Sequence, residues 1–94
     1  MRNLTWDDFR DAVGARYEVE AADISVTLTL NVAQPLADSG REGGSFRLEF
    51  LGPASPALPQ AIYRFNRDGD EPFEIFIVPV AAEPAGIRYE AIFY

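Results

Sequence analysis

The residues that are missing from this chain restrict its chemistry most. None of its 94 residues is histidine or cysteine, and all eight basic residues are arginine. Without histidine the commonest general base and metal ligand are absent, and without cysteine there is no thiolate or disulfide. Without lysine there is no Schiff-base or phosphate-loop amine. The sequence therefore predicts a domain that is not an enzyme, with no catalytic, cofactor-binding or metal-ligating residues.

The densest cluster of oxygen ligands lies in residues 66–71, Asn-Arg-Asp-Gly-Asp-Glu. A calcium loop of EF-hand type needs glycine at its sixth position and glutamate at its twelfth. Counted from Asn66, those positions hold Glu71 and Ile77, so the motif fails. Asp68-Gly69 is typical of a tight reversal, and a solvated hairpin turn is favoured over a weak cation site.

Paired carboxylates are the catalytic device that remains without histidine. Glutamates stand singly in three predicted strands, and arginines stand in the same or neighbouring strands. We therefore expect cross-strand ion pairs on a solvated face instead of an acid–base pair. The residues concerned are Glu49, Glu74, Glu90, Arg47, Arg64 and Arg88.

The elements that must position these residues are mostly strands. Apolar residues alternate with polar ones in residues 16–20, 24–32, 45–50, 60–65 and 87–94, which is the period of a half-buried strand. Residues 34–44 contain three glycines and a proline and predict a flexible exposed loop. The spacing of those glycines fits neither a phosphate loop nor a dinucleotide fingerprint.

Two segments depart from this alternation. Residues 5–13 predict a short helix, with Thr5 as N-cap, Gly14 as its stop and an apolar stripe of Trp6, Phe9 and Val13. Residues 73–80 predict a strand that is apolar on both faces, and both faces must then be covered. The helix stripe is the natural cover for the face around Phe76; otherwise that face needs a neighbouring subunit or a partner.

Together these elements predict one mainly β domain over residues 1–94: a six-stranded antiparallel small barrel or curled sandwich with one short N-terminal helix. The short connections favour a meander of neighbouring strands. The net charge of −7 argues against nucleic acid and anionic membrane surfaces as partners. No signal peptide or transmembrane segment is visible, so we expect a cytoplasmic protein.

The leading functional hypothesis is a non-enzymatic interaction or accessory module that binds a protein partner or a second copy. Its candidate surface combines the second face of residues 73–80 with the outer side of the last strand, and comprises Phe76, Val78, Val80, Ile92 and Tyr94. That last strand, if it stands at a sheet edge, could also pair with a partner strand.

Two alternatives stay open. The first is a small-ligand-binding β-barrel, with Gln60, Tyr63 and Arg64 as candidate polar groups in an internal cavity. The second is a carboxylate-based hydrolase, which needs two close carboxylates in a cleft, one of them with a raised pKa.

From Phe46 onward the chain resembles a bacterial family of small domains of unknown function. The matching pieces are residues 46–50 followed by Gly52-Pro53, residues 58–60 with Tyr63, residues 74–80, and residues 89–93, and the opening fits through Phe9 and Gly14. The resemblance implies a fold more than an activity, and it carries over no functional residue. It also suggests an association with proteins like phage tail-collar components.

Overall fold

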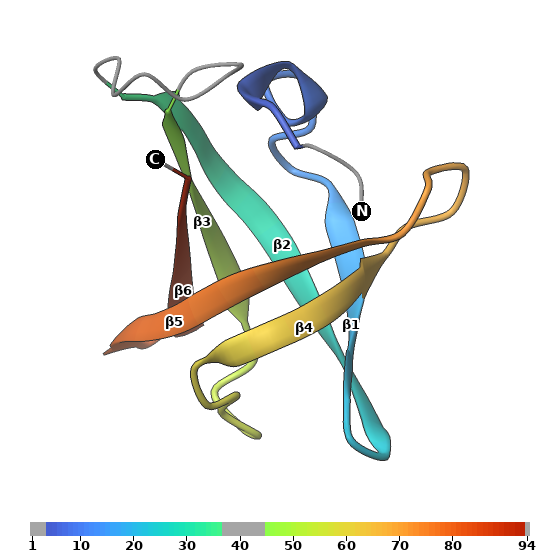
Figure 1. Cartoon of the computed structure of the whole chain (residues 1–94). Helices are drawn as coiled ribbons and strands as arrows, with labels where there is room; N and C mark the ends of the chain where they lie inside the picture. The colour runs from blue at the N-terminus through green and yellow to red at the C-terminus, as the bar shows by residue number, and fades with distance from the viewer. Residues whose placement is uncertain (1–3, 37–44, 94) are drawn as a thin grey trace.

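The computed structural model describes residues 4–36 and 45–93 of the chain (Figure 1). It contains one 3₁₀ helix, η1 (Trp6–Asp8), and six strands. The strands are β1 (Arg16–Ala21), β2 (Ile24–Pro35), β3 (Phe46–Gly52), β4 (Ala61–Asn66), β5 (Phe73–Glu83) and β6 (Gly86–Phe93).

The six strands form a closed barrel in the order β1-β2-β3-β6-β5-β4, and all neighbours are antiparallel. This confirms the predicted six-stranded antiparallel barrel. A continuous meander is wrong, however. Two three-stranded meanders, β1–β3 and β4–β6, are joined by residues 53–60, which cross from β3 to β4 and leave β6 beside β3. In the closed barrel β6 lies between β3 and β5, so the expectation that it stands at a sheet edge is wrong; only residues 91–93 extend beyond the ladder with β5.

The barrel closes because its two longest strands each serve two neighbours. β2 pairs with β1 up to Thr29 and with β3 from Thr29 onward, and its register shifts between Leu30 and Val32. β5 pairs with β4 up to Ile77 and with β6 from Val78 onward, with a shift between Pro79 and Ala81. A bulge bends a strand and increases its twist, so each long strand turns from one wall of the barrel into the next.

Side chains fill the interior. The apolar positions that alternate along the strands are buried, and four aromatic rings (Tyr17, Phe50, Phe65 and Phe73) contact one another with centroids 5.0–6.1 Å apart. A small barrel has room for little besides such side chains. Seven aromatic residues therefore belong to the core, whereas Phe76 is 51% exposed; the seven are Phe9, Tyr17, Phe46, Phe50, Phe65, Phe73 and Tyr89.

Each end of the barrel is covered by a chain segment, η1 and its flanks at one end and residues 53–60 at the other (Figure 1). Phe9 is 1% exposed, and its ring centroid lies 6.0 Å from that of Phe46 and 5.4 Å from that of Phe73. At the opposite end Leu58 is 2% exposed, and its backbone N–H donates to the hydroxyl of Tyr89 at 2.8 Å. The interior is thus closed at both ends.

The predicted helix over residues 5–13 is wrong in extent. Only one 3₁₀ turn forms, in which the Asp8 carboxylate accepts the backbone N–H of Thr5 at 2.8 Å. The chain then turns so that Phe9 enters the barrel end, while Val13 stays 54% exposed. Nine residues gain more from burying one aromatic ring than from completing a marginal helix.

The predicted role of this segment as a cover for the outer face of residues 73–80 is wrong as well. The Phe9 ring contacts Phe73, whose side chain points into the barrel, so the segment closes an end and leaves the outer face of β5 uncovered. Of the predicted loop over residues 34–44, Gln34 and Pro35 belong to β2, and residues 37–44 lie outside the described residues. Within residues 4–36 and 45–93, no helix is long and apolar enough to cross a membrane.

Candidate interaction surface

The outer face of the β4–β5 hairpin carries apolar side chains that are left exposed by residues 4–36 and 45–93. Ile62 and Phe76 are direct cross-strand partners, and they are 65% and 51% exposed. Farther along β5, Val78 is partly buried and Val80, in the bulge, is 46% exposed. We call these four residues the β4–β5 patch.

The structure places the predicted surface residues in two groups. Phe76, Val78 and Val80 lie in the β4–β5 patch. Ile92 is 41% exposed but lies apart from the patch. It pairs with Arg47 of β3, and the β5–β6 ladder ends at Val78 and Glu90, before Ile92 is reached. Tyr94 lies outside the described residues.

Ile62 is missing from the predicted surface, although the alternation along residues 60–65 puts it on the outer face. Its partner Phe76 could be identified only from the strand register, which the sequence does not give.

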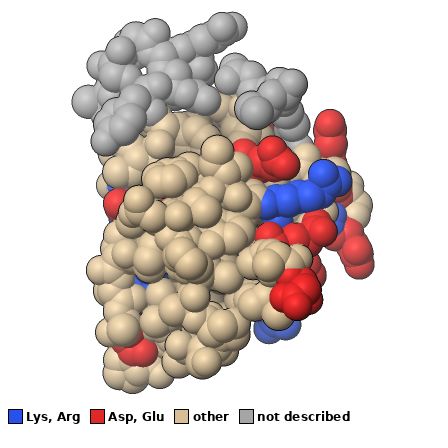
Figure 2. Space-filling view, turned by 60° about the horizontal axis from the view of Figure 1, so that its bottom comes forward, with Lys and Arg blue, Asp and Glu red and all other residues tan. Residues whose placement is uncertain are grey.

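Figure 2 shows this side of the molecule as a broad area without charged side chains, flanked by a cluster that is mostly acidic. The four residues of the β4–β5 patch present on the order of 300–400 Å² of apolar surface, a size at which patches on monomers often have a function. Glu74 precedes the patch on the outer face of β5. Its cross-strand neighbour Arg64 instead pairs with Glu20 at 3.4 Å.

The outer face of β3 and β6 carries the expected cross-strand ion pairs. Glu49 and Glu90 are direct neighbours across the ladder, and the guanidinium of Arg47 contacts both, at 3.0 Å for Glu90. Arg88 adds a contact with Glu49 at 3.2 Å. The hydrogen bond to Glu49, followed by that to Glu90, raises the pKa of Arg47 above its ordinary value although partial burial opposes the change. Two carboxylates do meet here, but arginine neutralises both, an arrangement that stabilises the sheet and is unsuited to proton transfer.

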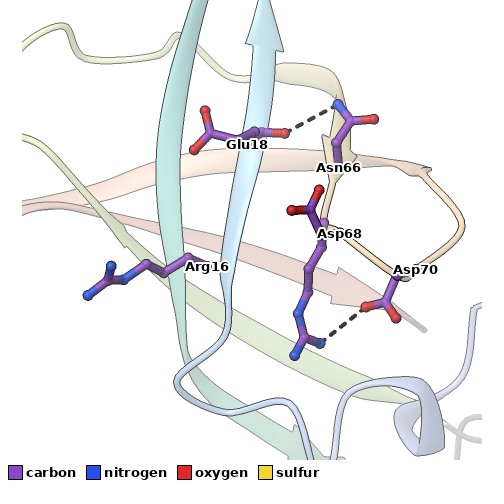
Figure 3. A pocket seen from close by; sticks show the side chains of 7 residues that line it. Arg16, Glu18, Asn66, Asp68 and Asp70 are labelled. Carbon is purple, nitrogen blue, oxygen red and sulfur yellow. Dashed lines mark hydrogen bonds and ion pairs between the residues drawn. The ribbon is translucent and has the colours of Figure 1, made fainter.

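The turn at residues 66–71 borders an open depression of about 620 Å³ at the seam of β1 and β4 (Figure 3). Its polar groups are largely satisfied by one another: the Asn66 amide donates to the backbone oxygen of Glu18 at 3.4 Å, and Arg67 pairs with Asp70 at 3.1 Å. Gly69 has a φ of +86°, as the predicted reversal requires. In the part of the chain that the structure describes, no group of three acidic side chains is arranged to hold a metal ion.

The carboxylate of Glu18 belongs to the same seam but turns toward β2. It accepts hydrogen bonds from the hydroxyls of Thr27 and Ser25, the latter at 2.9 Å. These bonds, the one from Thr27 first, lower the pKa of Glu18.

The polar groups of the ligand-binding alternative do not converge. Tyr63 and Arg64 are consecutive in β4 and therefore point to opposite faces of the strand. The Tyr63 hydroxyl donates to the backbone oxygen of Pro59 at 2.7 Å, and Gln60 is exposed. The structure thus brings together no polar lining for an internal cavity from these three residues.

Comparison with known proteins gives one match. The family model described as a domain of unknown function, DUF6916, matches residues 4–93, which include all six strands and both end covers. No curated protein and no solved structure matches the chain. The chain therefore belongs to the DUF6916 family of domains of unknown function.

Proposed function

We propose that this domain is a non-enzymatic protein-interaction module that docks a partner protein on the β4–β5 patch. The observation that carries the proposal is the exposed cross-strand pair of Ile62 and Phe76, beside a core that is complete without it. The N-terminal segment, which the sequence predicts as the cover of this face, instead packs at the end of the barrel, where Phe9 contacts Phe46 and Phe73.

The patch has the composition of the centre of an interface. It places one aromatic ring among β-branched side chains on a rigid sheet, so little conformational entropy is lost when a partner covers it. Its polar surroundings resemble the rim that surrounds such centres. The resemblance of the sequence to domains associated with phage-tail-like proteins suggests a multimeric partner of that kind.

Photo-crosslinking tests this function. A photoreactive phenylalanine analogue is placed at Ile62, and in a control protein at Val13, which is equally apolar and exposed but lies at the η1 end. In lysate of the native cell we expect a discrete crosslinked product from position 62 only. Excess unlabelled wild-type domain should compete it away, and the Phe76→Ser variant should not.

Crosslinks of equal yield and pattern from positions 62 and 13, or equal competition by wild type and Phe76→Ser, would contradict the proposal. Because Phe76 is exposed, the serine variant should keep its free energy of unfolding within about 0.5 kcal/mol of wild type, which separates lost docking from lost folding.

A further inference from the structure

The far half of β5 has a free backbone edge. β4 accompanies β5 only as far as Ile77, and beyond that point β5 pairs with β6 alone, from Val78 to Glu83. Residues 53–60 precede β4, but in the described chain no hydrogen bond joins them to the backbone of residues 78–83. Along these six residues, about 20 Å of strand, alternate residues thus direct to the side away from β6 backbone groups that no described residue pairs.

The corresponding edge of β2 is covered by the chain itself. β2 is the central strand of the first meander, as β5 is of the second. Its residues beyond Thr29 likewise pair with β3 and no longer with β1. There Gly14 donates to the Leu30 oxygen at 2.7 Å, and Leu30 donates to the Ala15 oxygen at 2.9 Å. The Trp6 indole adds a hydrogen bond to the Ala33 oxygen at 3.3 Å. Within the same molecule, this kind of edge is therefore covered by the turn at Gly14, the adjoining Ala15 and an aromatic side chain, which satisfy backbone groups of Leu30 and Ala33.

Pro79 agrees with a free edge. A proline within a barrel strand would remove a ladder hydrogen bond unless its nitrogen faced an unpaired side. Pro79 and the bulge beside it are also the devices that keep an exposed edge from pairing indiscriminately. The neighbouring side chains Val80 and Ala82 are exposed, so an incoming strand would meet apolar groups.

We propose, building on the proposed function, that an extended apolar segment of a partner protein with basic flanks adds to β5 as a strand along Val78–Glu83. Such a strand gains affinity from backbone hydrogen bonds and specificity from alternate side chains, which here would contact the β4–β5 patch. Basic residues in the flanks follow from the charge of the site: Glu74 is exposed on β5 beside the patch, on a domain of net charge −7, whereas Glu83 at the other end of β5 already pairs with Arg88 at 3.5 Å.

A second copy of this chain is a poorer occupant of the same edge. Each copy carries a net charge of −7, so association brings like charges together.

The experiment selects binders to the full-length chain from a library of random octapeptides. We expect enriched sequences with alternating β-branched or aromatic residues and Arg or Lys at one or both ends. A selected peptide should bind at least tenfold more weakly to Val80→Arg than to wild type, and Val13→Arg should bind it like wild type. N-methylation of alternate peptide amides, which blocks strand pairing but keeps the side chains, should abolish binding.

The other outcomes separate the two proposals. Peptides that tolerate N-methylation but are lost with Phe76→Ser would overturn strand addition and leave face docking intact. Selected peptides indifferent to both Val80 and Phe76, or an empty selection, would count against both. A dimer in sedimentation at 100 μM that Val80→Arg dissociates would overturn the commitment to a basic partner segment, because the edge would then bind a second copy.

Discussion

Replacing Phe9 by alanine tests whether the N-terminal segment is part of the fold or an appendage. The side chain is 1% exposed and contacts the rings of Phe46 and Phe73. The change returns about 150 Å² of apolar surface to water, which at ~25 cal/mol per Å² corresponds to about 4 kcal/mol. This lies within the ~3–5 kcal/mol that Phe→Ala substitutions in cores cost. In a domain of this size we expect the midpoint of thermal unfolding to fall by about 15–30 °C.

Urea unfolding measures this loss with two probes. Circular dichroism follows the barrel, and the fluorescence of Trp6, the one tryptophan of the chain, follows the segment. In Phe9→Ala we expect red-shifted Trp6 emission under native conditions, because the indole leaves the Ala33 carbonyl. Val13→Ala is the matched control and should change the free energy of unfolding by less than about 0.5 kcal/mol. A loss below about 1 kcal/mol in Phe9→Ala, with unchanged emission, would refute the assignment of this segment as an end cover.

Three further perturbations test other parts of the structure. Thr27→Val removes the hydroxyl that chiefly lowers the pKa of Glu18, so the Glu18 carboxyl should titrate at higher pH by NMR. A lowered pKa stabilises the fold at pH values above the ordinary pKa of 4.5, and this stability is lost as the pH falls through the pKa of the folded state. The variant should therefore lose less stability on acidification than wild type. Gly86→Ala should cost more than about 3 kcal/mol in urea unfolding, because φ is +139° and a Cβ would overlap the backbone oxygen of Gly52, at the end of β3. Gly69→Ala, at φ +86° with open space around it, should cost about 1 kcal/mol. Arg47→Met leaves two carboxylates facing each other and should cost about 1–3 kcal/mol in urea unfolding at pH 7; a loss below about 0.5 kcal/mol would show that Arg47 does not hold the two carboxylates together.

Local pattern was enough to predict the strands and their inner faces. The alternation of apolar and polar residues, as in Leu28 and Leu30 against Thr27 and Thr29, predicts which side chains are buried, because a strand has a period of two whatever its neighbours are. Asp68-Gly69 similarly predicts a reversal from two residues. The absence of histidine, lysine and cysteine limits the chemistry without any knowledge of the fold.

Long-range pairing was beyond the sequence. The bulges near Leu30 and Pro79 let β2 and β5 change partners, and nothing in the local pattern shows that these strands bend. The helix over residues 5–13 was wrong for the same reason, since the apolar spacing of Trp6, Phe9 and Val13 does not show that Phe9 alone finds a site at the barrel end.

For the candidate surface, the sequence by itself determined that residues 73–80 are apolar on both faces and that some cover is required for each. Only the tertiary structure decided that the barrel covers one face, that the other stays exposed beside Ile62, and that the far half of the strand keeps a free edge. The physical reason is that burial and edge pairing depend on which distant strands close the barrel, and that choice is made by the packing of the whole core and not by any one segment.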